Sequence, residues 1–185
     1  VRERLHARKT KIPIGVSIAK TNSPDTCTTE KGIADYVRAM KTVMPVADYL
    51  TINISCPNAY GGEPFTKPEL LDLLLSATDD TLGLKKIPSE GNSGEESAGP
   101  KEVIRPVFLK MPADLTNDQA DALAEVALRH QVDGLILSNL TKRRDRLSVY
   151  PNETVPSTHG GLSGRPVRES STHLIGHLFR SFGDR

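Results

Sequence analysis

The stretch "ADYLTINIS", residues 47–55, is a short apolar run with Leu and Ile at its centre. Three other stretches have the same character: "IPIGVSIA" at 12–19, "RPVFLKM" at 105–111 and "VDGLILSN" at 132–139. Runs of this length and composition are typical of parallel strands that are covered on both faces. The sequence therefore predicts four buried strands, of which residues 47–55 form the second.

A helical pattern of apolar residues follows each predicted strand. Thr66 with Glu69, and Thr116 with Gln119, have the spacing of capping boxes, which predicts that helices start there. Pro166 stands near the start of the fourth helix. The apolar residues expected on the buried helix faces are Ile33, Tyr36, Val37, Met40, Leu70, Leu73, Leu74, Ala120, Leu123, Ala124, Ala127, Leu174, Ile175, Leu178 and Phe179. Strand and helix thus alternate four times, which predicts an α/β fold with a parallel sheet.

Two irregular segments interrupt this alternation, at residues 81–100 and 142–161. The first is rich in Gly, Ser, Glu and Pro, and is expected to be a surface insertion. The second begins with "KRRDR" and is too long for an ordinary connector, so we expect a functional or disordered loop. Residues 1–185 are expected to form one domain that carries both insertions.

Composition narrows the class of protein. The 185 residues carry a net charge of +1, and 37% are hydrophobic, which is typical of a globular protein without a general nucleic-acid partner. No apolar run approaches 18 residues, and the chain, which begins with Val1, shows no signal-peptide core. The two cysteines, Cys27 and Cys56, fit neither a disulfide framework nor a zinc pattern, so a reducing, cytoplasmic-type compartment is expected.

Polar residues gather where the predicted strands end. They are Ser17, Asn53, Cys56, Lys110, Ser138 and Asn139. In a parallel sheet or barrel these carboxyl ends share one face, and ligands bind there. A lysine between Leu109 and Met111 costs several kcal/mol in a strand core unless it is paired or faces a polar site. The repeated placement on four strands favours a binding site at this face.

Each feature also has a purely structural interpretation. Cys56 alone is most often a buried thiol, and Asn53 and Asn58 are good turn formers around Pro57. The stretch "GGLSG" at 160–164 is either a flexible turn or a loop whose N–H groups approach a phosphate. Their common position at the strand ends is what favours the functional interpretation.

Four stretches, "ADYLTINISCPN", "PVFLKMPADLT", "VDGLILSN" and "GGLSGRPVRESS", supported by "IGVSIAK", resemble the dihydroorotate dehydrogenase family in order and spacing. The resemblance implies an α/β fold of the (β/α)8 TIM barrel type, with FMN at the carboxyl ends of the strands. Such a barrel takes about 250 residues. The four strand–helix units of this chain therefore predict about half of a barrel. Such a half on its own would expose unpaired strand edges, and we expect it to bind FMN weakly or not at all.

The resemblance also implies a role for each candidate site residue. Cys56 stands at the position of the catalytic base, which removes the carbon 5 proton of dihydroorotate while a hydride passes from carbon 6 to flavin N5. The residues implied to bind substrate are Asn53, Asn58 and Asn139. Those implied to contact FMN are Ser17, Asn53, Lys110, Ser138 and Gly164. The reaction forms orotate during the biosynthesis of UMP, and Lys110 would stabilise negative charge on the reduced ring.

The sequence mixes features of two classes of the family. A Cys base is typical of the soluble class, which passes electrons to fumarate or a nicotinamide. The stretches "VDGLILSN" and "GGLSG" look more like the quinone-using class, which normally has a Ser at the base position. The chain departs from the family at two further positions: Ser17 stands where many quinone-linked members have an asparagine, and Leu140 stands where a threonine often follows the asparagine. Quinone is the expected acceptor, and a soluble one stays open. A quinone enzyme would associate with the cytoplasmic membrane through a segment outside this chain.

Two other functions stay open. The chain could be a truncated barrel that acts as a binding module, or part of a related flavin enzyme that acts on another pyrimidine. The first is disfavoured because Asn53, Cys56, Asn58, Lys110 and Asn139 are all present.

Overall fold

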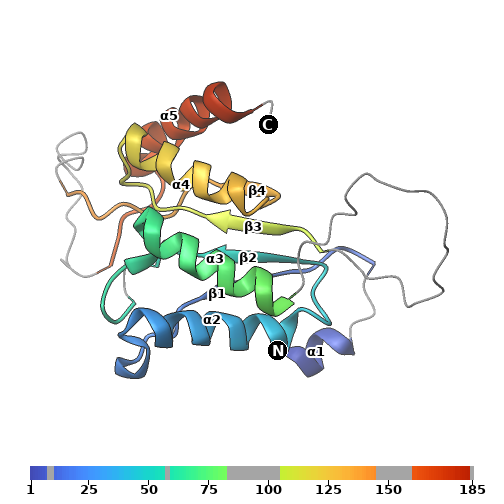
Figure 1. The fold of residues 1–185 in the computed structure, drawn as a ribbon. Helices are drawn as coiled ribbons and strands as arrows, with labels where there is room; N and C mark the ends of the chain where they lie inside the picture. Colours follow the sequence, from blue (N-terminus) through green and yellow to red (C-terminus); the bar gives the residue numbers. More distant parts are fainter. Residues whose placement is uncertain (8–10, 57–58, 83–104, 145–159, 184–185) are drawn as a thin grey trace, which may run out of the picture.

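The computed structural model of the chain describes residues 1–7, 11–56, 59–82, 105–144 and 160–183. At its centre lies a four-stranded sheet in the order β1-β2-β3-β4, with every neighbouring pair parallel (Figure 1). The strands are β1 (Gly15–Ala19), β2 (Tyr49–Asn53), β3 (Val107–Lys110) and β4 (Gly134–Ile136). All four strands predicted from the sequence are thus confirmed, each with shorter bounds than expected.

Helices alternate with these strands along the chain. They are α1 (Arg2–His6), η1 (Pro24–Thr26), α2 (Thr29–Val43), η2 (Pro64–Thr66), α3 (Pro68–Leu82), α4 (Asn117–Arg129) and α5 (Arg165–Phe182). Helices α2, α3 and α4 lie along one face of the sheet, and α5 packs beside α4 (Figure 1). The predicted α/β architecture is confirmed.

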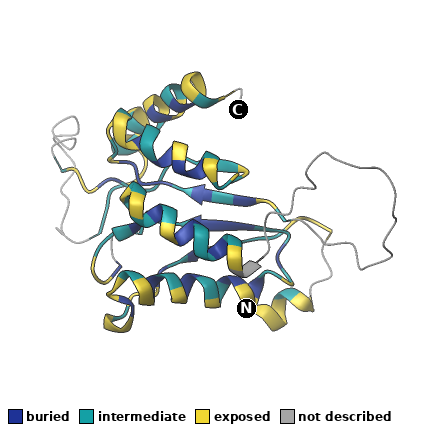
Figure 2. Cartoon of the chain, in the orientation of Figure 1, coloured by how far each residue is buried: buried dark blue, intermediate teal, exposed yellow. Residues whose placement is uncertain are grey.

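The hydrophobic core lies between the sheet and this helix layer (Figure 2). Leu50, Ile52 and Leu109 project from the strands toward the helices and are almost fully buried. The residues between them in sequence point to the opposite face, because side chains alternate along a strand. This opposite face carries the polar strand-end residues, so the core fixes which way they point.

The buried faces of two helices differ from the sequence expectation. In α3 the buried leucines are Leu71, Leu74 and Leu75, whereas Leu73 is 52% exposed. In α5 Leu174 and Leu178 are buried as expected, but Ile175 and Phe179 are 49% and 73% exposed. The "LLDLLL" run of α3 is apolar nearly all round, so periodicity alone could not tell which leucines face the sheet.

Only one of the two predicted capping boxes forms. Thr116 accepts from the Gln119 backbone N–H, and the Gln119 side chain accepts from the Thr116 N–H in return. The prediction for Thr66 and Glu69 is wrong, because α3 begins later, at Pro68, and the Thr66 hydroxyl donates to the Glu63 carbonyl at 2.7 Å. Pro68 favours this later start, since a proline suits the first turn of a helix.

The two predicted insertions lie largely outside the described residues. The first was expected to begin at residue 81, but α3 continues to Leu82, and residues 83–100 are not described. Of the second, only 142–144 and 160–161 are described. Its ends are drawn together by an antiparallel bridge between Thr141 and Leu162.

Truncating a leucine tests which face of α3 is buried. We expect Leu74→Ala to lower the free energy of unfolding of the full-length gene product by about 2–5 kcal/mol, because the side chain is fully buried. Leu73→Ala is the matched control, one residue away and half exposed, and should stay within about 0.5 kcal/mol of wild type. Chemical unfolding measures both, and similar losses for the two variants would contradict the assigned face.

An ionic cluster joins α3 to the end of α4. His130 lies between two carboxylates, with Nδ1 2.7 Å from Asp79 Oδ2 and Nε2 3.0 Å from Asp72 Oδ1. Arg129 also donates to Asp72, at 2.9 Å. The hydrogen bonds from Arg129 and then His130 lower the pKa of Asp72 below its ordinary value.

The lowered pKa of Asp72 predicts a pH-dependent contribution to stability. The charged carboxylate should stabilise the folded state above its ordinary pKa of 3.8, and this stabilisation should be lost as the pH falls through the lower folded-state value. Asp72→Asn should therefore lower the thermal midpoint of the full-length gene product near neutral pH, and the difference from wild type should vanish in strong acid. Asp80→Asn, on an exposed aspartate of the same helix, is the control. A constant difference at all pH values would argue against the assignment.

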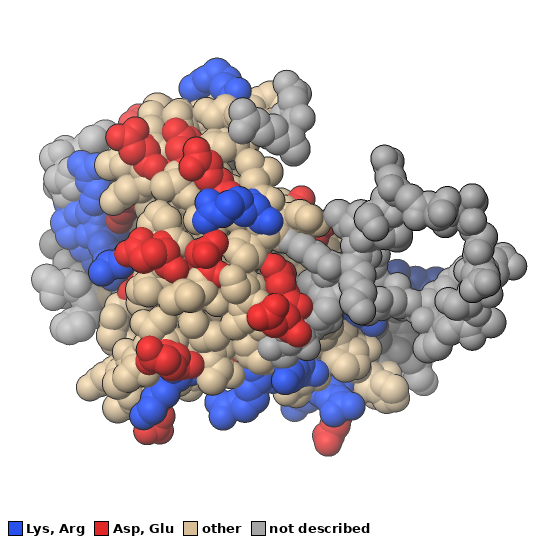
Figure 3. Space-filling view, in the orientation of Figure 1, with Lys and Arg blue, Asp and Glu red and all other residues tan. Residues whose placement is uncertain are grey.

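Acidic and basic side chains are interspersed over the helical face shown in Figure 3, which presents no large patch of one sign. None of the helices within the described ranges is both long and apolar enough to cross a membrane.

Candidate functional site

The carboxyl ends of the strands are held in register. Asn53 at the end of β2 pairs with Ala19 on one side and with Lys110 on the other, and Lys110 pairs with Ile136. Hydrogen bonding continues past the strands, from Ile54 N to Lys110 O at 3.3 Å and from Asn139 N to Met111 O at 3.2 Å. The segments that carry Asn53, Lys110 and Asn139 are therefore neighbours, as the sequence predicted.

Asn53 and Asn139 are both fixed to Ser55, which immediately precedes Cys56. The Asn53 Oδ1 atom accepts from the Ser55 N–H at 3.1 Å and from its hydroxyl at 2.7 Å. Asn139 Nδ2 donates to the Ser55 carbonyl from the other side. Because Ser55 occupies one end of each amide, the orientation of both side chains is set. Within the described ranges, the NH2 group of Asn53 and the oxygen of Asn139 have no hydrogen-bond partner.

Buried Tyr36 of α2 supports the same segment from the helix side. Its hydroxyl donates to the Asn53 carbonyl at 2.8 Å, and its ring meets that of Phe65 edge to face. Burial raises the pKa of Tyr36 well above its ordinary value, so the hydroxyl stays protonated and remains a donor at neutral pH.

Cys56 is a free, partly exposed thiol three residues beyond the end of β2. It borders a small cavity whose other walls include Lys20, Tyr36, Asn53 and Glu63. Cys56 is therefore not part of a disulfide within the described residues, and part of its surface is exposed. Asn58, predicted to bind substrate, lies outside the described residues.

Lys110 is the last residue of β3 and is half-buried. Within the described part of the chain its ammonium has no hydrogen-bond or ion-pair partner. Its neighbours in the register, Asn53 and Ile136, are uncharged. A cation in such surroundings favours an anionic or electron-rich ligand next to it.

The other residues predicted to contact the cofactor, Ser17, Ser138 and Gly164, do not all lie at the ends of strands. Ser17 lies in the middle of β1, paired with Thr51, and is exposed on the sheet face opposite the helices. Ser17 therefore lies two residues before the carboxyl end of β1, whereas the sequence analysis placed it at the strand end. Ser138 follows β4, and its hydroxyl lies 2.6 Å from that of Ser171 in α5.

Gly164 precedes α5 as its N-cap residue, with a φ of +76° that favours glycine. A Cβ atom at this position would contact no other atom within 4 Å. Glycine is therefore favoured here by the positive φ and not by a lack of space. Two residues earlier, Leu162 forms the bridge to Thr141.

A second polar cluster, which the sequence did not single out, lies among the loops at the same end of the sheet. Buried Thr141 donates to Asp114, which also accepts from the Lys142 N–H at 2.7 Å. Glu63 is part of the same group: burial raises its pKa, Lys142 opposes this shift and Asp114 adds to it. These contacts tie together the loops that follow β2, β3 and β4. Asp114 and Thr141 lie three and two residues after the ends of predicted strands, and this position was the signal from which they could have been found.

Comparison with known proteins gives a consistent result. The family model described as dihydroorotate dehydrogenase matches residues 1–185. A protein named dihydroorotate dehydrogenase (quinone) from Thermobifida fusca (strain YX) is 34% identical over 190 residues, which cover 100% of this chain and 45% of that protein. The protein of the same name from Shewanella sp. (strain ANA-3) is 36% identical over 174 residues, covering 94% of this chain and 46% of that protein.

The crystal structure of the ligand-free DHODH from Eimeria tenella has a TM-score of 0.70 and 30% sequence identity, and the match covers 99% of this chain and 48% of that one. The chain thus spans less than half the length of these relatives. Its four strand–helix units correspond to about half of a TIM barrel. The match over the whole chain, in sequence and in fold, shows that it belongs to the dihydroorotate dehydrogenase family.

Proposed function

We propose that this chain is the substrate-binding and proton-abstracting part of an FMN-dependent enzyme that oxidises dihydroorotate to orotate for the biosynthesis of UMP. One observation carries the proposal. Asn53 and Asn139 are hydrogen-bonded to the same residue, Ser55, which directly precedes the partly exposed Cys56. The two amides and the strand ends thus form one hydrogen-bonded unit, and the residue that carries the thiol comes directly after it.

The free groups of the two amides suit a pyrimidine ring. Asn53 presents N–H donors and Asn139 presents an oxygen acceptor, which is the complement of a ring carbonyl beside a ring N–H. Asn58 would add a third amide, as the family resemblance implies. A site that satisfies each polar edge of a ring discriminates strongly against analogues that lack those groups.

Cys56 would act as the general base. The thiolate takes the proton from carbon 5 of dihydroorotate, carbon 6 releases a hydride, and the double bond of orotate forms between these two carbons. Thiols ordinarily have a pKa of about 8.5, which is nearer to neutral pH than the hydroxyl of a serine base, and a general base works best near the operating pH. Tyr36 and Asn53 hold the segment that carries the thiol.

The residues of the sheet end fit a flavin. FMN, when bound, supplies the hydride acceptor for this chemistry. Lys110 offers an ammonium with no partner among the described residues, placed to stabilise negative charge. Ser17 is exposed on the same sheet face, and Asn53, Ser138 and Gly164 would complete the contacts implied by the resemblance. The exposed Gly164 leaves room for a ligand to approach the backbone.

Quinone is the proposed electron acceptor, supported by the two relatives that are named for it. A quinone enzyme would work at the cytoplasmic membrane, held there by a segment outside this chain. The test mixes the purified full-length gene product with dihydroorotate and, in turn, a soluble quinone, fumarate or NAD, and measures orotate. Orotate should form fastest with quinone. Rapid formation only with fumarate or NAD would contradict the acceptor, and none with any acceptor would contradict the substrate.

A further inference from the structure

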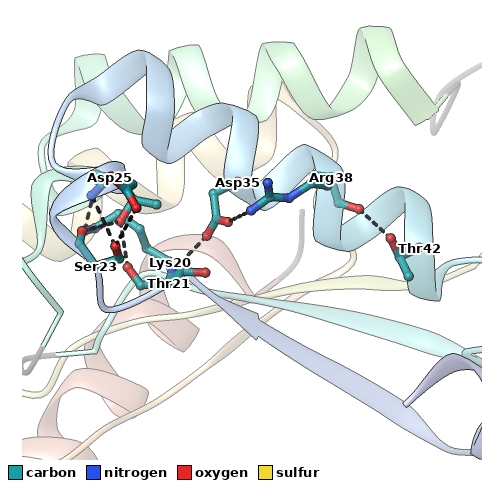
Figure 4. A network of polar contacts seen from close by, with 8 residues as sticks. Lys20, Thr21, Ser23, Asp25, Asp35, Arg38 and Thr42 are labelled. Atoms are coloured by element: carbon teal, nitrogen blue, oxygen red, sulfur yellow. Dashed lines mark hydrogen bonds and ion pairs between the residues drawn. The ribbon is translucent and has the colours of Figure 1, made fainter.

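Lys20 is a buried lysine just beyond the end of β1, with 6% of its surface exposed. Its side chain runs toward the helix layer, where its Cδ atom lies close to Gly32 of α2: a Cβ at Gly32 would be 3.3 Å from it. Figure 4 shows Lys20 beside Thr21, between the η1 residues and Asp35 of α2. Asp35 does not neutralise Lys20, because its Oδ2 accepts from the Thr21 N–H and its Oδ1 binds Arg38.

The ammonium of Lys20 uses all three donors on neutral oxygens. It donates to the carbonyl and the hydroxyl of Thr26, at 3.3 and 3.5 Å, and to the carbonyl of Tyr60. Among the described residues no carboxylate pairs with it. Burying a cation costs several kcal/mol unless its hydrogen bonds are satisfied, so this side chain is held firmly in one place.

The bond to Tyr60 reaches the turn that follows Cys56. Within this turn the Ala59 N–H donates to Cys56 O at 3.3 Å, and the Gly62 N–H donates to Ala59 O at 2.9 Å. The Tyr60 ring does not anchor the turn, because this residue is 50% exposed. Gly61 and Gly62 adopt φ values of +78° and +81°, which glycine adopts without strain.

Lys20 therefore connects three segments: the end of β1, the η1 turn at Thr26, and the turn at Tyr60. Lys20 and Cys56 also line the same small cavity. We propose that Lys20 is a positioning residue for Cys56, which holds the turn at Tyr60 so that the thiol faces carbon 5 of the substrate. This inference rests on the proposed function and adds a residue that the family resemblance did not assign.

Removing the ammonium should misplace the thiol without disturbing the flavin contacts. Lys20→Met keeps most of the stem and loses the three hydrogen bonds. Because a displacement of about 1 Å in a catalytic group can cost a factor of 10² in rate, we expect flavin reduction at saturating dihydroorotate to slow by roughly ten- to a hundred-fold. FMN content should be unchanged, and Lys20→Arg should recover part of the rate.

The experiment uses the full-length gene product and two readouts. The first is hydrogen exchange of the Gly62 amide, which should quicken in Lys20→Met because the turn loses its anchor, whether or not the protein is active. The second is single-turnover flavin reduction with dihydroorotate deuterated at carbon 5, for which the isotope effect should rise as proton removal becomes slower. Lys31→Met, on an exposed lysine of α2, should change neither.

The outcomes separate the two proposals. If hydrogen exchange at Gly62 is unchanged in Lys20→Met, Lys20 does not anchor the turn. If exchange is faster but flavin reduction keeps the wild-type rate and isotope effect, Lys20 has a structural role only, and the proposal that it positions Cys56 is overturned. If Lys20→Met does not fold, Lys20→Arg decides: a slower rate with a larger isotope effect supports the proposal, and wild-type values overturn it. A wild-type protein that dihydroorotate does not reduce would instead contradict the proposed function.

Discussion

Cys56→Ala is expected to abolish rapid reduction of the flavin by dihydroorotate while leaving FMN bound. A general base contributes about 10²- to 10⁴-fold to a rate, and alanine cannot accept a proton. FMN should stay because the contacts proposed for it come from other residues, among them Ser17 and Lys110. Stopped-flow measurement of flavin reduction in the full-length gene product gives the rate, and released flavin gives the content.

Two further variants sharpen this test. Cys56→Ser should keep part of the activity, with a pH optimum shifted upward, because a hydroxyl loses its proton less readily than a thiol. Cys27→Ala is the control, since Cys27 is the other free cysteine and is exposed. If Cys56→Ala reduced its flavin as fast as wild type, another group would have to be the base.

Lys110→Met should lower the rate of flavin reduction by roughly 10²- to 10³-fold, comparable to the loss of one preorganised donor at a developing charge. The ammonium stands at the end of β3 with no acidic partner among the described residues, so its charge is free to stabilise negative charge that develops on a bound ring. Stopped-flow flavin reduction again gives the rate, and the reduction potential of the bound flavin should fall.

The control is Lys41→Met, on an exposed lysine of α2 far from the strand ends in sequence. Lys110→Arg keeps the charge and should retain more activity than the methionine variant. If Lys110→Met keeps the wild-type rate of flavin reduction and the wild-type reduction potential of the flavin, the charge of Lys110 has no role in the reaction. The lysine would then contribute only the packing of its aliphatic side chain at the strand end.

Much of the fold was predictable because strand composition is a strong signal. The four buried runs were found from sequence, and the capping box at Thr116 marked its helix start within one residue. The alignment of Asn53 and Lys110 also followed, because parallel strands bring their carboxyl ends to one edge.

The errors arose where local patterns were ambiguous or where tertiary contacts decide. The six-residue run that includes Leu71 and Leu73 has no polar side to orient it except Asp72. The predicted cap at Thr66 does not form because α3 begins at Pro68, and the Thr66 hydroxyl donates to the Glu63 carbonyl. Ser17 shares the site's sheet face but lies two residues before Ala19, the residue at which both the predicted strand and β1 end.

The residues that sequence reasoning missed act through distant contacts. Lys20 binds Tyr60, 40 positions along the chain, and Tyr36 binds the Asn53 backbone, 17 positions along. Contacts between residues so far apart in the chain produce no periodic pattern in the sequence, so neither could be predicted from it. A lysine directly after a predicted buried strand was visible, and could have been questioned in the way that Lys110 was.

Two alternative functions make different predictions for the same protein. A binding module without catalysis would bind dihydroorotate or orotate without any change in flavin absorbance. An enzyme for another pyrimidine would reduce its flavin with that substrate and leave it oxidised with dihydroorotate. Comparing these substrates side by side separates all three functions.

The most direct measurement is anaerobic mixing of the full-length, FMN-loaded gene product with dihydroorotate, following the absorbance of oxidised flavin. Family membership, the amide pair on Ser55 and the partly exposed Cys56 together predict rapid bleaching, with one orotate formed per flavin reduced. A flavin that stays oxidised in the presence of saturating dihydroorotate would contradict the proposed function.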